Sequence, residues 1–279
     1  MIDYIFDKPR NMIIISDEDF DLTQTFECGQ CFRWNKNPDC SYTGIAFGKK
    51  LTLKHIDDKV LLYNTSEEDF NYYWRNYFDL SLNYGNVKRA LGAMHPVMKK
   101  VCDYAPGIRI LNQEPFEALI SFIISQNNNI PRIKGIIDRL CAGFGEYKEG
   151  TGFAFPTPQR LAMLSEDDLA PIRSGFRAKY ICDAAKKTAD GEIDLEQISK
   201  MPIEEAREKL MTIKGVGPKV AECVLLYGMH RLECFPLDVW MKRAMRVYFP
   251  DKTPGFFGNY AGIAQQYIFH YSRFNLKEG

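Results

Sequence analysis

Residues 212–230, TIKGVGPKVAECVLLYGMH, join a tight Gly-x-Gly turn to a proline and a long apolar run. Gly215 and Gly217 can take backbone angles closed to other residues and let another chain approach closely. Pro218 suits the first position of a helix, where its missing N–H costs nothing. The stretch therefore predicts two helices joined by a tight corner.

The corner has two interpretations, which these residues alone leave open. Free N–H groups at the start of the second helix form an anion site, and two helices joined in this way can grip a phosphodiester. This is the helix-hairpin-helix pattern of nucleic-acid binding. An ordinary corner between two packed helices also needs glycines.

Lys219 stands in the first turn of the apolar second helix. Partial burial and the positive end of the helix dipole disfavour its charged form. A neutral amine is a nucleophile that can attack an electrophilic carbon and form a Schiff base. The alternative is a lysine that stays charged and binds phosphate.

Asp238 lies in CFPLDVWMKRAM (residues 234–245), where another helix is expected to begin. Its simplest interpretation is an N-cap, because aspartate accepts hydrogen bonds from the first N–H groups of a helix. A carboxylate near a nucleophilic amine could also stabilise positive charge developing on a sugar carbon. The hairpin and this aspartate together are a more specific signal than either alone.

The rest of the chain predicts an α+β fold. Between residues 10 and 63, short β-branched and aromatic runs alternate with Asn, Asp, Gly and Pro, with a hairpin turn in HIDDKV (residues 55–60). Helical patterns begin near residue 66 and dominate from 113 onward. We expect an N-terminal antiparallel β domain with covering helices over residues 1–112, followed by a helical domain over 113–279.

Composition excludes several classes of protein. The 36 basic and 36 acidic residues give a net charge of zero, which argues against a purely electrostatic nucleic-acid binder. Eight cysteines include one C-x-x-C, Cys28 and Cys31, but no second pair completes a zinc site. No signal peptide or transmembrane run is seen. A soluble intracellular protein with reduced cysteines is expected.

Four segments resemble a known family in order and spacing: CGQCFRWN (28–35), FEALISFIISQNNNIPRI (116–133), GVGPKVAECVLL (215–226) and YAGIAQQYIF (260–269). They are similar to the 8-oxoguanine DNA glycosylase/AP lyase branch of the helix-hairpin-helix, Gly/Pro-Asp glycosylases. The resemblance implies a β domain followed by a helical glycosylase domain. It also implies a monomer that excises 8-oxoguanine from duplex DNA with no cofactor or metal.

By this resemblance, Lys219 is the catalytic lysine and Asp238 the assisting aspartate. The backbone carbonyl of Gly29 accepts a hydrogen bond from N7–H of 8-oxoguanine, a proton that guanine lacks. Gln265 meets the Watson–Crick edge of the base.

Cys223 and Phe269 are expected to sandwich the flipped ring. Cys223 follows Lys219 by four residues, and Phe269 follows Gln265 by four, so each pair shares a helix face. The plain alternative places Cys223 and Phe269 in the core and Gln265 on a solvated face.

The resemblance also assigns contacts to DNA. Asn127 fills the gap left by the flipped base, and Arg132 and Arg177 contact the cytosine opposite. Phe176 is the aromatic wedge, where eukaryotic relatives typically carry tyrosine, so we expect looser selectivity for cytosine. Three asparagines after an apolar helix also suit an ordinary turn, with Asn129 capping the next helix.

Further DNA contacts are expected from the hairpin glycines Gly215 and Gly217 and from Trp240. Trp240 stands where a histidine often contacts phosphate, and its indole N–H could still donate. In a prokaryote such a protein would be cytoplasmic and nucleoid-associated, and in a eukaryote nuclear.

Two rival functions remain open at this point. Another glycosylase of the superfamily is the first, although no cysteine follows Cys234 to build the iron–sulfur cluster of some relatives, and alkylation glycosylases generally lack the lysine. A non-enzymatic helix-hairpin-helix module is the second. It would not explain Asp238, Gln265 and Phe269 together.

Overall fold

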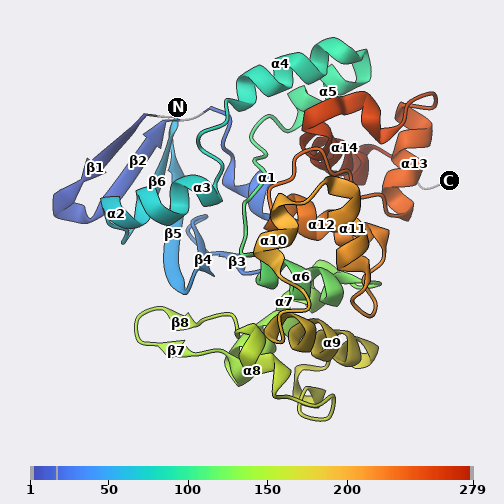
Figure 1. Cartoon of the computed structure of the whole chain (residues 1–279). Helices are drawn as coiled ribbons and strands as arrows, with labels where there is room; N and C mark the ends of the chain where they lie inside the picture. The colour runs from blue at the N-terminus through green and yellow to red at the C-terminus, as the bar shows by residue number, and fades with distance from the viewer. Residues whose placement is uncertain (1–2, 17, 277–279) are drawn as a thin grey trace.

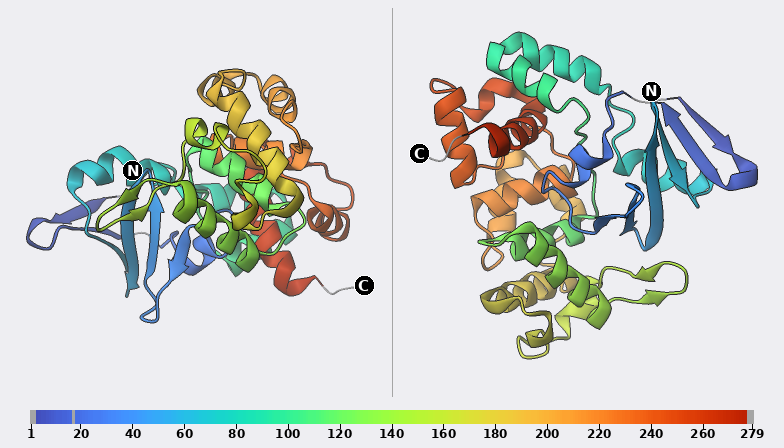
Figure 2. Two further views of the ribbon diagram at one scale, coloured as in Figure 1. Left: turned by 90° about the horizontal axis from the view of Figure 1, so that it is seen from below. Right: turned by 180° about the vertical axis from the view of Figure 1, so that it is seen from behind.

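The computed structural model describes residues 3–16 and 18–276. It shows an antiparallel sheet beside a helical body, which confirms the predicted α+β class. In Figure 1 the sheet occupies the left of the molecule, and helices α4 to α14 lie to its right and below it. The view from behind shows the same separation (Figure 2, right).

The sheet has six strands in the order β1-β2-β6-β5-β4-β3, with every neighbouring pair antiparallel. The strands are β1 (Tyr4–Asp7), β2 (Met12–Ser16), β3 (Trp34–Lys36), β4 (Tyr42–Ala46), β5 (Lys49–Ile56) and β6 (Lys59–Tyr63). Alternate residues such as Ile13 and Ile15 are fully buried, as the period of two in a half-buried strand requires. The expected turn between β5 and β6 is confirmed, with Asp57 at φ 54°.

Strand β1 was not predicted from the sequence. It is a short edge strand whose Ile5 is 64% exposed, and it lies before the runs between residues 10 and 63 from which the other strands of the sheet were predicted. The two-residue strands β7 (Tyr147–Lys148) and β8 (Gly152–Phe153) were missed as well, because two residues show no period.

An aromatic cluster fills one face of the sheet. It is covered by a helical segment made of α2 (Glu67–Asp69), η2 (Phe70–Trp74) and α3 (Arg75–Tyr77), which Ser66 caps by accepting from the N–H of Asp69. Trp34 stacks on Phe26 at 4.5 Å and donates to the Tyr77 hydroxyl at 2.7 Å. The short helices η1 (Lys8–Arg10) and α1 (Leu22–Phe26) complete this half.

The helical body consists of α-helices of 5 to 15 residues. They are α4 (Tyr84–Met94), α5 (Pro96–Tyr104), α6 (Pro115–Ser125), α7 (Ile130–Phe144), α8 (Pro158–Ala162), α9 (Ala178–Ala189), α10 (Leu195–Lys200), α11 (Ile203–Met211), α12 (Pro218–Gly228), α13 (Val239–Tyr248) and α14 (Ala261–Asn275). Short turns η3 (Ala170–Ile172), η4 (Gly175–Arg177) and η5 (Pro254–Tyr260) connect them. Within the described part of the chain, no helix is long and apolar enough to cross a membrane.

Two apolar clusters meet where the chain passes from one half to the other. Ile108 and Ile110 belong to the helical cluster, whereas Leu111 belongs to the cluster under the sheet. Helices α4 and α5 precede this crossing but pack into the helical cluster through residues such as Leu91 and Val101. The domain boundary at residue 112 stays a prediction.

A buried ion pair joins the two halves. Arg33, just before β3, contacts Glu117 of α6 at 3.4 Å, and the two side chains are only 8% and 11% exposed. The same guanidinium donates to the carbonyl of Phe153 in β8 at 2.5 Å. Burial raises the pKa of Glu117 to about 7, against the opposing attraction of Arg33.

We expect this carboxyl to make the protein less stable as the pH rises from about 4.5 to about 7. The folded state holds the Glu117 proton more tightly than the unfolded state does, so folding is favoured below that window and loses stability across it. The change is at most about 3 kcal/mol, because one pKa unit corresponds to about 1.4 kcal/mol.

Denaturant unfolding of the wild type and Glu117→Gln at several pH values measures this effect. The two free energies of unfolding should agree near pH 4.5 and diverge toward pH 7.5, with the variant the more stable. The opposite slope would mean that attraction to Arg33 outweighs burial.

Candidate active site

The corner between α11 and α12 depends on one glycine more than on the other. Gly215 has φ 76°, and a Cβ there would lie 2.4 Å from the ring of Tyr180. Gly217 is the N-cap of α12 at φ −99°, an angle open to any residue, and a Cβ added there would meet nothing within 4 Å. The expectation that both glycines need special angles is therefore correct only for Gly215. At Gly217 the glycine leaves open space at the helix start.

Lys219 is half-buried in the first turn of α12, and its Nζ lies 5.4 Å from the centre of the Phe122 ring. One turn further along, Cys223 is almost fully buried. Burial raises the pKa of the Cys223 thiol, although the nearby Lys219 charge opposes this. Cys223 is therefore a neutral thiol that offers an apolar surface beside the amine.

A small pocket surrounds the Lys219 side chain and contains six of the predicted site residues. Its lining comes from the loop before β3 and from α6, α12, α14 and the loop before α13: Cys28, Gly29, Phe122, Lys219, Cys223, Tyr227, Pro236, Asp238, Gln265, Gln266 and Phe269. Its volume of about 50 Å³ accommodates only a few water molecules, so a nucleobase can enter only if side chains move. In this structure the pocket is therefore too small for a base.

Asp238 is the N-cap of α13, as its simplest interpretation predicted, and its Oδ1 accepts from the N–H of Met241 at 2.7 Å. It also lines the pocket beside Lys219, so the two interpretations are compatible. The preceding loop is anchored by buried Glu222, which accepts from the N–H of Phe235 at 2.7 Å and from Arg207 at 2.7 Å. Helix α12 thus fixes where Asp238 begins its own helix.

The remaining pocket residues come from distant segments. Gly29 has φ 87°, an angle that favours glycine, so its backbone turns toward the pocket without a side chain. Gln265 and Phe269 lie on the same face of α14, with Gln265 5% exposed and Phe269 half-buried. The alternative of a solvated face for Gln265 is wrong.

A groove of about 510 Å³ leads to Lys219 from the loop after α6. Asn127, at φ 47°, lines this groove together with Gly217 and Asp238. The cap predicted for Asn129 is confirmed, since its Oδ1 accepts from the N–H of Arg132 at 3.0 Å. Lys219 and Asp238 line the groove as well as the pocket, so the groove opens onto the same two residues.

Arg177 does not face this groove as a free cation. Its side chain is buried and donates to the carbonyls of Gln126, Asn127 and Ser174, the last two at 3.0 Å. Burial and the nearby charge of Arg132 lower its pKa. In this structure Arg177 holds the loop that carries Asn127, so the expected contact with an opposite base is not available without rearrangement.

The other predicted DNA contacts differ in their availability. Arg132 is exposed at the start of α7, and Phe176 is 53% exposed, with the Arg177 guanidinium 4.4 Å from its ring centre. Trp240 already donates its indole N–H to the Ser272 hydroxyl at 2.7 Å. That donor is therefore occupied, contrary to the expectation that it was free for a phosphate.

Sequence reasoning missed five residues of the pocket. They are Cys28, Phe122, Tyr227, Pro236 and Gln266. A signal existed for Tyr227, which follows Cys223 by four residues on the same face of α12. Gln266 and Phe122 had none, because their segments look like ordinary core helices.

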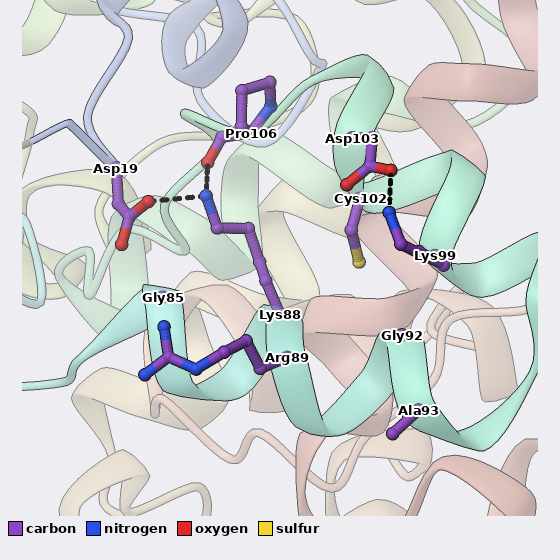
Figure 3. Close-up of a pocket in the computed structure, with 10 residues that line it drawn as sticks. All are labelled: Asp19, Gly85, Lys88, Arg89, Gly92, Ala93, Lys99, Cys102, Asp103 and Pro106. Carbon is purple, nitrogen blue, oxygen red and sulfur yellow. Dashed lines mark hydrogen bonds and ion pairs between the residues drawn. The ribbon is translucent and has the colours of Figure 1, made fainter.

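A second hollow, of about 610 Å³, lies between α4 and α5 (Figure 3). Lys88 there is paired with Asp19 at 2.5 Å and donates to the carbonyl of Pro106 at 2.8 Å, and Lys99 is paired with Asp103 at 2.6 Å. These cations are neutralised within the protein, and none of the predicted site residues lines the hollow. Among the described residues, no group of three or more His, Cys, Asp or Glu is placed to hold a metal ion.

Comparison with known families divides the chain in two. A family model for "8-oxoguanine DNA glycosylase, N-terminal domain" matches residues 12–119, and one for "HhH-GPD superfamily base excision DNA repair protein" matches residues 120–255. The N-glycosylase/DNA lyase OGG1 of Arabidopsis thaliana is 30% identical, covering 89% of this chain and 76% of the relative. The N-glycosylase/DNA lyase of Saccharomyces cerevisiae is 42% identical, covering 49% of this chain and 40% of its own length.

Solved structures agree over nearly the whole chain. MBOgg1 in complex with a low-affinity DNA ligand has a TM-score of 0.92 at 43% identity, covering 99% of this chain and 100% of that one. The Clostridium acetobutylicum 8-oxoguanine glycosylase/lyase was solved bound to duplex DNA with cytosine opposite 8-oxoguanine. It has a TM-score of 0.89 at 40% identity, and the match covers 99% of this chain and 98% of that one.

The two hairpin glycines offer a matched pair of variants. Gly215→Ala forces an alanine into a left-handed angle against Tyr180 and should lower the free energy of unfolding by about 1–3 kcal/mol. Gly217→Ala meets no such obstacle and should change stability by less than about 1 kcal/mol. Denaturant unfolding of both variants measures the difference.

The Gly217→Ala variant also tests whether a phosphate of DNA approaches the start of α12. The added methyl group of Gly217→Ala should weaken binding to duplex DNA by roughly three- to tenfold, because it occupies the open space at the helix start. Fluorescence anisotropy with labelled duplex measures this, and unchanged affinity would contradict it.

Proposed function

Because the chain belongs to the 8-oxoguanine DNA glycosylase family, we propose that it excises 8-oxoguanine from duplex DNA and then cleaves the strand as an AP lyase. The observation that supports this best is the convergence of Lys219, Asp238, Gly29 and Gln265 on one pocket. A DNA-binding module needs the hairpin but has no use for such a pocket.

The first chemical step joins Lys219 to the sugar of the flipped nucleotide. The amine of Lys219 forms a bond to C1′ while the bond from C1′ to N9 of the base breaks, and the base departs with a proton. The carboxylate of Asp238, the N-cap of α13, stabilises the positive charge that develops on the sugar.

The second step cleaves the strand. The sugar ring opens to give a Schiff base between Lys219 and C1′, a proton leaves C2′, and the bond from C3′ to its phosphate oxygen breaks. Water then releases the lysine. The side-chain amine thus serves first as nucleophile and then, as the Schiff base, as electron sink.

Recognition of the base uses the walls of the pocket. The Gly29 carbonyl accepts the N7–H that 8-oxoguanine has and guanine lacks, and Gln265 contacts the Watson–Crick edge. Cys223 and Phe269 lie on either side of the ring. Because the pocket holds only a few waters in this structure, side chains that line it move aside when the base enters.

Flipping leaves a hole and an orphaned partner base, which costs a few kcal/mol of lost stacking and pairing. Asn127 fills the hole from the groove beside Lys219, and exposed Phe176 wedges next to the partner base. The protein acts as a monomer on chromosomal DNA. Binding weakens with salt, despite zero net charge, because phosphate contacts release counterions.

Lys219→Gln tests the nucleophile. The variant should bind lesion DNA like the wild type yet lose excision and strand cleavage by at least about a thousandfold, because glutamine cannot attack C1′. Single-turnover assays on duplex with 8-oxoguanine opposite cytosine measure both steps. Anisotropy on the same duplex measures binding.

Lys214→Gln is the matched control, since Lys214 lies in the same hairpin with a side chain 72% exposed. In the presence of borohydride it should still form a covalent adduct with lesion DNA, whereas Lys219→Gln should form none. Excision by Lys219→Gln at near the wild-type rate would overturn the assignment.

Phe176 bears on the choice of the opposite base. We expect the wild type to excise 8-oxoguanine opposite A, G and T as well as C, because phenylalanine offers no hydroxyl to the partner base. Phe176→Tyr should raise the preference for cytosine by roughly fivefold, the effect of about one added hydrogen bond. Excision rates on the four duplexes measure this, and a wild type that cuts only the C pair contradicts it.

A further inference from the structure

A chain of buried hydrogen bonds holds the backbone just before Gly29. Gln266 of α14 donates from Nε2 to the carbonyl of Cys28 at 3.1 Å. Its Oε1 in turn accepts from the hydroxyl of Tyr227 on α12. The residue preceding Gly29 is therefore tied to two helices of the helical body.

A second chain holds the backbone just after Gly29. Gln113 donates from Nε2 to the carbonyl of Gln30 at 2.8 Å, and its own N–H donates to the backbone carbonyl of Tyr227 at 2.8 Å. Both chains therefore end on Tyr227, one at its hydroxyl and one at its carbonyl. We call this closed set, Tyr227, Gln266, Cys28, Gln30 and Gln113, the amide ring.

Every member of the amide ring is buried. Gln30, Gln266, Tyr227 and Gln113 are 0%, 2%, 4% and 6% exposed. These bonds are therefore shielded from bulk solvent, and the loss of one member leaves its partners without their protein partner. Gly29 itself has great backbone freedom, so its angle of φ 87° depends on what holds its neighbours.

Tyr227 also links the amide ring to the pocket. Its ring stacks on Phe122 at 5.3 Å, and Phe122 lies beneath the Lys219 amine. Its single phenolic proton goes to Gln266, whereas Gln265 Oε1 lies 3.4 Å away, beyond a strong hydrogen bond. The Gln265 oxygen is thus left to accept from a base.

We propose that Tyr227, Gln266 and Gln113 are positioning residues for lesion reading: the amide ring fixes the direction of the Gly29 carbonyl in the pocket. This inference rests on the proposed function, since it presumes that this carbonyl reads N7–H. A displaced carbonyl would weaken the choice of 8-oxoguanine over guanine without touching Lys219. Base reading and lysine chemistry can therefore be separated.

Two substrates make the separation measurable. Duplex containing 8-oxoguanine opposite cytosine needs both base reading and chemistry, whereas the same duplex with a preformed abasic site needs only Lys219. For Tyr227→Phe and Gln266→Met, we expect excision of 8-oxoguanine to fall by about tenfold or more, as for loss of a buried hydrogen bond that fixes a reading group. Cleavage at the abasic site should stay within about threefold of the wild type.

Tyr267→Phe is the matched control. Tyr267 lies on α14 and is fully buried, and its hydroxyl lies 3.0 Å from the carbonyl of Ile108 and 3.3 Å from that of Pro106, neither of which belongs to the amide ring. The variant loses a comparable buried bond, so its melting temperature should fall like that of Tyr227→Phe. Its ratio of excision to abasic cleavage should remain that of the wild type.

The outcomes distinguish this inference from the function on which it rests. A wild type that cleaves abasic DNA but spares 8-oxoguanine defeats the proposed substrate, and with it the inference. A wild type active on both, with variants that keep full excision or lose both activities equally, defeats the inference alone. If Gln266→Met does not fold, Tyr227→Phe, which removes a single oxygen atom, still decides the question.

Discussion

The left-handed turn at Gly215 determines how α11 and α12 meet, and much of the site follows from that meeting. Because the turn packs against Tyr180, α12 begins at the surface with open space at Gly217 and then runs directly into the core. Lys219 is in the first turn, where surface becomes interior, and Cys223 and Tyr227 follow on the same face. One helix thus supplies the amine, a wall of the base pocket and the anchor of the amide ring.

Asp238 depends on the same helix. Glu222 of α12 holds the loop that precedes α13 through the N–H of Phe235, so the cap of α13 falls beside Lys219. Burying a carboxylate is costly unless it is paired and hydrogen-bonded, and Arg207 provides the pairing here. Packing therefore brings the Asp238 carboxylate beside Lys219, whereas its role as the cap of α13 is set by the residues that follow it.

Local signals explain what the sequence predicted well. The β-branched and aromatic runs in residues 10–63, the Gly-x-Gly-Pro turn and the caps Asn129 and Asp238 are each determined by near neighbours, and each is confirmed. The four-residue spacings of Lys219 with Cys223 and of Gln265 with Phe269 placed each pair on one helix face. Gly29 was reached only through family resemblance, because nothing in CGQC marks a carbonyl that lines a pocket.

Long-range contacts explain what the sequence did not predict. Gln266 and Cys28 are 238 residues apart, and no pattern in either segment marks their hydrogen bond. Arg177 shows the same limit: the family resemblance assigned it a contact with the cytosine opposite, but the short turn η4 directs it inward onto the carbonyls of Gln126 and Asn127.

The most direct test of the central claim is to identify the residue that becomes bonded to the sugar. The wild type is incubated with 8-oxoguanine duplex, the Schiff base is reduced with borohydride, and the adduct is digested and mapped by mass spectrometry. If the nucleophile is the amine in the first turn of α12, the deoxyribose remnant will be found on Lys219. An adduct on another residue, or no adduct from a protein that excises the base, would contradict it.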